Sequence, residues 1–161
     1  MIITNAKERG RFLRFAFVGV VGAVVDGGTY NLLFGLFKMP VVIAGSISFS
    51  LAVVSNFIWN RYWTYPDSRS KSISFQLGQF IIISLIGLFV LRDPLLAWLP
   101  PKFVSFFDKV SISSLITLPI SKLLTPTFLG NNLAWVIAVL VVMMWNFFAN
   151  RYWTYSDVSA K

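Results

Sequence analysis

The sequence predicts an all-α membrane protein in which four transmembrane helices form two tandem helical hairpins. Apolar residues make up 57% of the chain and charged residues only 12%, whereas a soluble domain carries about 25% charge. Four apolar runs are each long enough to approach the ~30 Å hydrocarbon core of a bilayer. The hexapeptide NRYWTY occurs twice, once after the second run and once after the fourth. Residues 1–161 are therefore expected to form a single membrane domain.

The apolar runs give the expected spans in order. The first covers about 15–37 and the second about 41–59, and the short joint between them predicts an antiparallel hairpin. The polar stretch PDSRSKS then precedes a third span at about 75–91, and the fourth covers about 133–149. The first run is too long for a signal-peptide core and lacks a convincing cleavage site, so it is expected to be a retained span.

Residues 92–132 are expected to form a long loop on the outer face. They mix large apolar residues with prolines, serines and isolated lysines, a composition that favours interfacial or shallow re-entrant segments. A fifth span beginning near Val104 is the alternative, and four residues oppose it: Asp108, Lys109, Pro119 and Lys122.

The basic residues predict the direction of the chain. Nine of the fourteen lie in short flanks at the N-terminus, after the second run and at the C-terminus: Lys7, Arg9, Arg11, Arg14, Arg61, Arg69, Lys71, Arg151 and Lys161. By the positive-inside rule, both termini are expected in the cytoplasm, in a multi-pass protein of the inner (cytoplasmic) membrane. Because these residues flank apolar runs, the net charge of +8 favours anionic lipids over nucleic acid as partners.

Several kinds of chemistry are excluded by composition. Histidine and cysteine are both absent, which removes histidine general bases, thiol nucleophiles and the usual zinc ligands. No acid, base and nucleophile converge in the pattern. The sequence therefore predicts no enzyme activity, no cofactor and no metal.

The repeated hexapeptide belongs to a longer match. NFIWNRYWTY (56–65) aligns with NFFANRYWTY (146–155), and eight of the ten positions are identical. Counting back in fours along each helix gives a narrow stripe of small residues that ends in two asparagines: Ala44, Ser48, Ala52, Asn56 and Asn60, and Ala134, Ala138, Val142, Asn146 and Asn150. Small stripes allow close helix packing, and asparagine amides bond between helices. The first and third runs also correspond, so a parallel internal repeat of two hairpins is expected.

Two kinds of polar residue stand out near or within the spans. Asp26 is the only carboxylate inside an expected span. Its burial in lipid costs at least ~2.5 kcal/mol, so it should face the bundle, a cavity or water, in a functional role or a structural bond. Arg61 and Arg151 follow the asparagine pairs, where they either anchor the chain beside interfacial aromatics or bind a lipid phosphate.

At these residues the chain resembles the GtrA-like family of small membrane proteins. The resemblance lies in RFLRFAFVGVVGAVVDGGTYNLLF and SNFIWNRYWTY, and residues 93–132 look longer than usual. It implies translocation of a polyprenyl-phosphate-linked monosaccharide to the outer leaflet for cell-surface polysaccharide synthesis. By motif position, it implies these substrate-binding residues: Arg14, Asp26, Asn56, Asn60, Arg61 and Trp63, with Asn146, Asn150, Arg151 and Trp153 as their repeat partners.

Two other functions stay open at this point. One is a non-transporting anchor or assembly subunit for a membrane glycosyltransferase that uses a polyprenyl phosphate. The other is a small-molecule exporter that uses Asp26, although paired asparagines and arginines favour an anionic lipid over a cation. Four short helices enclose little space, so a homodimer with its groove near the interface is plausible.

Overall fold

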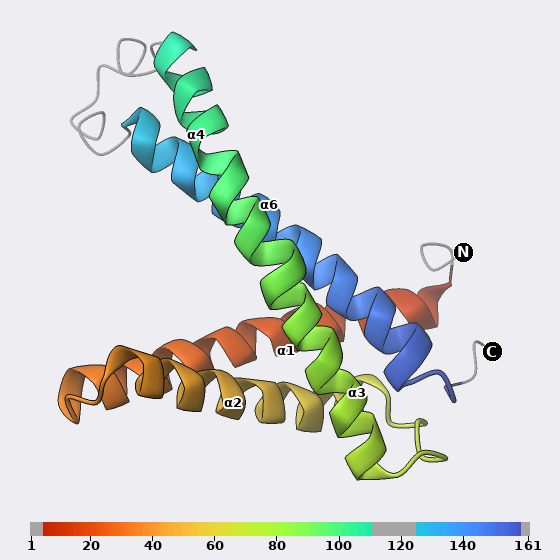
Figure 1. Cartoon of the computed structure of the whole chain (residues 1–161). Coiled ribbons are helices and arrows are strands. Elements are labelled where there is room, and N and C mark those ends of the chain that lie inside the picture. The colour runs from red at the N-terminus through yellow and green to blue at the C-terminus, as the bar shows by residue number, and fades with distance from the viewer. Residues whose placement is uncertain (1–4, 111–124, 159–161) are drawn as a thin grey trace. The chain divides into compact units, whose positions relative to one another are not determined.

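The computed structural model describes residues 5–110 and 125–158, which form long helices joined by turns (Figure 1). Within these residues, four helical stretches are long and apolar enough to cross a membrane: Ala6–Leu36, Val41–Thr64, Ile73–Val110 and Pro126–Thr154. The prediction of an all-α protein with four membrane-spanning helices is confirmed.

Each stretch contains an α-helix and a π-helical turn, in which the backbone bonds reach back five residues. The elements are α1 (Ala6–Asn31) with η1 (Leu32–Leu36), α2 (Val41–Trp59) with η2 (Asn60–Thr64), α3 (Ile73–Ile86), η3 (Gly87–Arg92) and α4 (Asp93–Val110), and α6 (Pro126–Ala149) with η5 (Asn150–Thr154). They divide into two compact units. The first holds the chain through Ser84 together with the segment from Phe147, and the second holds Leu85–Asn146.

The first helix begins well before the apolar run. The Asn5 side chain caps α1 by accepting a hydrogen bond from the Lys7 amide at 2.9 Å, and Glu8 in the first turn favours the positive end of the helix dipole. A capped start explains why the helix extends through the polar residues that precede the expected span at residue 15.

In the first unit, α1 and α2 form the predicted antiparallel hairpin (red to yellow in Figure 1). Lys38 makes the turn with a left-handed backbone, φ 54°, and Pro40 precedes the first residue of α2. Further along the hairpin, the Asn56 side chain lies against Gly22, where a Cβ atom would overlap it. The small residue therefore sets how closely the two helices approach at this level.

The expected small stripes are buried. In α2, Ala44, Ser48 and Ala52 are buried, and in the second unit Ala134 and Ala138 of α6 are fully enclosed. Hydroxyl groups elsewhere in the spans bond to their own helix, as when Ser50 Oγ donates to the Ser46 carbonyl at 2.7 Å. Lipid offers no partner for such groups, so this bonding within the helix keeps the spans compatible with a bilayer.

An aromatic core holds the first unit together. Phe57 of α2 packs edge-on against Phe80 of α3, with ring centroids 5.8 Å apart. Phe147, at the end of α6, packs edge-on against Phe12 and Phe15 of α1, at 5.0 and 5.6 Å. Edge-to-face rings add to the free energy gained by burial. Elements distant in the sequence are thus joined at one end of the bundle.

In the second unit, two glycines fix the contact between α6 and the preceding helical stretch (blue and green in Figure 1). Gly87 of η3 lies against Val142, Trp145 and Asn146 of α6, and Gly130 of α6 lies against the Val104 backbone. A side chain at Gly130 would strike that backbone. Glycine is required there because the two backbones are in close contact.

The structure differs from the sequence-based expectation over residues 92–132. The expected loop is helical over Asp93–Val110 and again from Pro126. Prolines 94, 100 and 101 suggested breaks, but Pro94 lies in the first turn of α4, directly after η3, where the chain already departs from α geometry. Residues 111–124, with the remainder of the expected loop, lie outside the described residues. The helices at 41–59 and 133–149 likewise extend further, through both copies of NRYWT.

We predict that Gly22→Leu lowers the melting temperature of the detergent-solubilised protein, because the new side chain must displace Asn56 from the α1 and α2 contact. Gly19→Leu is the matched control, since the space around Gly19 in the same helix is open. Differential scanning fluorimetry would compare the two variants with the wild type. An equal effect at both positions would contradict the assigned contact.

Candidate functional site

The two copies of NRYWTY adopt the same local structure. Each continues its α-helix into a π-helical turn, η2 in one copy and η5 in the other. The amides of Tyr65 and Tyr155 close these turns on the carbonyls of Asn60 and Asn150, both at 2.8 Å. In both copies the asparagine, arginine and threonine are buried, while the first tyrosine and the tryptophan are exposed. The six letters therefore specify one conformation, which occurs twice.

The two copies meet through their final tyrosines. Tyr65 and Tyr155 are fully buried and stack with ring centroids 4.3 Å apart and planes inclined by 18°. Burial raises the pKa of each hydroxyl well above its ordinary value, so both stay protonated at neutral pH. The stack is a neutral centre, and charged groups surround it.

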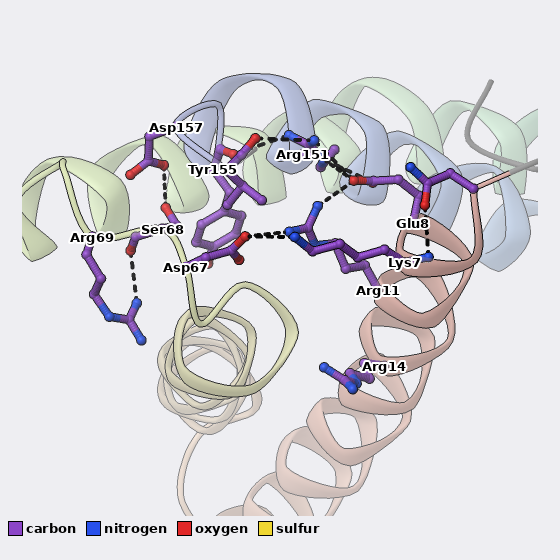
Figure 2. Close-up of polar contacts among 12 residues, drawn as sticks. Lys7, Glu8, Arg11, Arg14, Asp67, Ser68, Arg69, Arg151, Tyr155 and Asp157 are labelled. Carbon is purple, nitrogen blue, oxygen red and sulfur yellow. Dashed lines mark hydrogen bonds and ion pairs between the residues drawn. The ribbon is translucent and has the colours of Figure 1, made fainter. Parts of the chain in front are cut away.

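Arg151 of the second copy is neutralised by a carboxylate from the start of the chain. Its Nε and Nη2 donate to Glu8 at 3.0 and 3.1 Å, and both residues are buried (Figure 2). Glu8 also accepts a hydrogen bond from Arg11, and a second nitrogen of Arg11 forms an ion pair with Asp67 at 2.7 Å. Figure 2 shows these four side chains as a continuous chain of alternating charge. It joins α1, the segment after η2 and the C-terminal segment.

A second polar network holds the C-terminal segment to the link between α2 and α3. Asp157 accepts hydrogen bonds from the Ser68 hydroxyl and from the Ser70 hydroxyl and amide. Burial raises the pKa of the Asp157 carboxyl, but these bonds outweigh it and hold that pKa below its usual value. Gln76 of α3 joins this network by donating to Ser68 at 2.6 Å.

Arg61 of the first copy has a different environment. Its side chain is buried, at 5% exposure, yet Nε and Nη1 have no hydrogen-bond partner among the described residues. No carboxylate of the described chain pairs with it. The two hexapeptides thus share a conformation but differ in the charge balance of their arginines.

An open pocket of about 380 Å³ lies between the start of α1 and the end of η2, and polar and charged residues are among those that line it: Ala6, Lys7, Gly10, Arg11, Arg14, Thr64, Pro66 and Asp67. Three of these residues are basic and one is acidic. Arg14 is exposed, and one of its nitrogens donates to the Trp63 carbonyl at 3.2 Å. The pocket volume falls in the range of about 300–1,000 Å³ typical of small-molecule sites.

The structure brings most of the sequence-predicted site residues to this end of the first unit. Trp63 and Trp153 are exposed there, and each carbonyl accepts a bond from a basic side chain, Arg14 or Lys71. Asn60 and Asn150 are buried beside their arginines. The remaining three are elsewhere: Asp26 and Asn56 lie farther along the hairpin, and Asn146 belongs to the second unit. In the described part of the chain, no ion pair or hydrogen bond engages the Asp26 side chain.

Sequence reasoning missed the residues that complete the site. Glu8, Arg11 and Asp67 lie outside the apolar runs and were expected only as polar flanks. One available signal was the spacing of Glu8 and Arg11, which places opposite charges on one helical face at i and i+3. Nothing in the sequence indicated that Arg151, 143 positions away, would share the Glu8 carboxylate.

We predict that Glu8→Gln destabilises the protein by about 3 kcal/mol, because it leaves the buried Arg151 without its counter-charge. Thermal unfolding in detergent would measure this. Glu8→Asp, which keeps the charge on a shorter side chain, should recover part of the loss. Equal melting temperatures for wild type and Glu8→Gln would contradict a structural ion pair.

Stability should also fall in acid through Asp157. Because its pKa is lowered in the folded protein, its contribution is complete above the unfolded pKa of about 3.9 and is lost as the pH falls through the folded pKa. Melting curves between pH 3 and pH 6 would test this. The Asp157→Asn variant should be less stable at pH 6 and lose less on acidification than the wild type. Parallel pH profiles for the two proteins would refute the assignment.

The comparisons with known proteins agree with this architecture. The family described as GtrA/DPMS, transmembrane domain, matches residues 14–155. A dolichol-phosphate mannosyltransferase of Pyrococcus furiosus is 36% identical over 80 residues, which are 50% of this chain and 22% of the relative. The membrane protein YngA of Bacillus subtilis is 27% identical over 152 residues, 94% of this chain and 84% of the relative. This chain spans under a quarter of the mannosyltransferase but most of YngA. Because the family match runs from the first helix to the second hexapeptide, the chain belongs to the GtrA/DPMS transmembrane-domain family.

Proposed function

We propose that the protein moves a polyprenyl-phosphate-linked monosaccharide across the cytoplasmic membrane, for glycosylation of cell-surface polysaccharide. The observation that carries the proposal is the basic pocket beside the first hexapeptide, lined by Lys7, Arg11 and Arg14 with Asp67. Family membership supports the same lipid class, because one relative is named for dolichol phosphate, and dolichol is a polyprenol.

The pocket has the chemistry that such a headgroup requires. A phosphate needs cationic donors, and Arg14 offers a guanidinium of which one nitrogen already bonds to a carbonyl. Sugar hydroxyls need donors and acceptors together, and Asp67 and Thr64 provide oxygen atoms on the same lining. With the headgroup in the pocket, the polyprenyl tail stays in the lipid, which matches its solubility.

In this proposal, the polar residues of the α1 and α2 hairpin line the path that the headgroup takes into the membrane. Asn56 has an amide oxygen without a partner among the described residues, and Asp26 of α1 is half-buried. Both give a passing headgroup polar contacts within otherwise apolar helices. The sequence contains no GxxxxGK[ST] phosphate loop, so the transport is passive or ion-coupled. The cytoplasmic position of the pocket follows from the basic flanks that surround it.

A second candidate function has one specific observation in its favour. The mannosyltransferase relative is more than four times as long as the region it shares with this chain. A region of this kind also occurs, therefore, within a longer protein named as an enzyme. The alternative is that this chain anchors a polyprenyl-phosphate glycosyltransferase and moves no lipid.

Reconstitution separates the two functions. Purified protein in liposomes, with a radiolabelled polyprenyl-phosphate sugar, should expose the label to the opposite leaflet faster than empty vesicles do. Arg14→Ala should slow the initial rate about tenfold, the size expected for one lost charge-assisted hydrogen bond. Asp26→Asn should also slow it without loss of expression. Lys109→Ala is the control, because Lys109 is exposed in α4 and does not line the pocket.

Two outcomes of these assays would contradict parts of the proposal. If wild-type vesicles move label no faster than empty vesicles, while a co-expressed glycosyltransferase copurifies with the protein, the anchoring function is correct. If transport occurs and Arg14→Ala matches Lys109→Ala, the pocket is not the headgroup site.

A further inference from the structure

The two hexapeptides are identical in sequence and backbone conformation, so any difference between them reports on their surroundings. In both, the asparagine, arginine and threonine of NRYWT are buried. The hydrogen bonds of the same three side chains can therefore be compared in two different surroundings within one protein.

In the second hexapeptide, the buried asparagine, arginine and threonine have partners within the protein. Thr154 Oγ1 donates to Asn150 Oδ1 at 2.8 Å. Arg151 donates to Glu8 and, more weakly, to the Tyr155 and Val158 carbonyls at 3.4 and 3.5 Å. These three residues have the bonding expected of a structural element. The Tyr155 hydroxyl, like that of Tyr65 in the first copy, has no hydrogen-bond partner among the described residues, so the tyrosines do not distinguish the two copies.

In the first hexapeptide, the same groups lack partners in the described part of the chain. Asn60 Oδ1, Arg61 Nε and Nη1, and Thr64 Oγ1 are all buried without a hydrogen bond. Buried polar groups are normally paired, and a buried cation without a counter-charge is especially unfavourable. A cluster of unpaired groups on one π-helical turn therefore favours a role in binding over a purely structural one.

One member of the cluster also borders existing space, and Asn60 and Arg61 precede it in the same π-helical turn. Thr64 lines the pocket of about 380 Å³ that Arg14 and Lys7 enclose. A ligand in that pocket would lie against the turn that carries Asn60 and Arg61. The equivalent threonine, Thr154, instead accepts hydrogen bonds at its own backbone carbonyl from the side chains of Gln76 and Lys71.

We propose that the first hexapeptide binds the phosphate of a hydroxyl-bearing headgroup, and that the Glu8 carboxylate fills the equivalent position in the second. Arg61 supplies two free nitrogen donors to the phosphate, in the way that Arg151 supplies two to the carboxylate. Asn60 Oδ1 accepts from a hydroxyl, and the Thr64 hydroxyl serves either group. This inference rests on the proposed function for the identity of the headgroup as a phosphorylated lipid.

The inference assigns different roles to two arginines that the sequence presents as equivalent. Arg61 is a substrate-binding residue, whereas Arg151 is a structural one. It also predicts that removing the charge costs stability at Arg151 and not at Arg61. Removing the charge of Arg61 relieves a buried cation, whereas removing that of Arg151 leaves Glu8 buried beside Arg11 alone.

The test is binding of farnesyl phosphate to the purified full-length protein in detergent, with farnesol as the uncharged reference. Arg61→Gln should weaken farnesyl phosphate binding at least tenfold and leave farnesol binding unchanged. Thr64→Val should weaken it severalfold, whereas the matched Thr154→Val should bind as the wild type does. In thermal unfolding, Arg61→Gln should keep its melting temperature and Arg151→Gln should lose several degrees.

Further arms identify the source of the phosphate. Inorganic phosphate and phosphatidylglycerol are tested as competitors. The proposal requires that farnesyl phosphate bind more tightly than either, and equal competition by one of them would overturn it in favour of a free ion or bulk lipid. A loss of stability in Arg61→Gln with unchanged binding would also overturn it, because Arg61 would then be structural.

The same variants keep this inference separate from the transport proposal. If farnesyl phosphate binding depends on Arg61 but vesicles move no lipid, the site stands and transport fails. If vesicles move lipid and Arg61→Gln changes neither binding nor rate, transport stands and the site fails.

Discussion

The buried carboxylate of Glu8 is the group on which the polar end of the first unit depends. It neutralises Arg151 and Arg11 together, and Arg11 extends the contact to Asp67. Glu8 and Arg11 together bond the start of α1 to the start of η5 and to the segment after η2. The Tyr65 and Tyr155 stack lies in the same region, so aromatic packing and ion pairing act at one place. Most of the remaining described surface is apolar and suited to lipid. The directional contacts that specify how these segments pack are therefore concentrated at this polar end of the first unit.

That concentration explains why function is best sought at the same end. The apolar lengths of the helices offer few hydrogen bonds to a headgroup, whereas the hexapeptides, the basic flank and the pocket lie within a few turns of one another. A lipid-linked sugar has its charge and its hydroxyls in one small group. A membrane protein that handles it needs a polar site of similar size at the bilayer surface, with the tail left outside.

The sequence predicted the helices well because each depends on local composition. Four apolar runs and two small stripes were enough to anticipate the spans and the buried faces of α2 and α6. The reading of 92–132 as a loop rested on its prolines. Pro94 lies in the first turn of α4, where proline is tolerated, but Pro100 and Pro101 lie inside the helix. The candidate site was only half predictable. Arg14, Asn60 and Arg61 carried a visible motif, but the pairing of Arg151 with Glu8 depends on tertiary contact and had no local signal.

The separation of Glu8 and Arg151 has a consequence for how the protein is made. The two residues are 143 positions apart, and synthesis at about 5–20 residues per second places roughly 7 to 30 seconds between them. During that interval α1 is already in the membrane, while the acid at its start awaits the base at the end of the last helix. The η5 turn thus supplies the second counter-charge of Glu8 only when the fourth helical stretch is nearly synthesised. Until then Arg11 is the only counter-charge of Glu8 among the described residues, so a chain that stops short of η5 lacks the ion pair that connects α1 to η5.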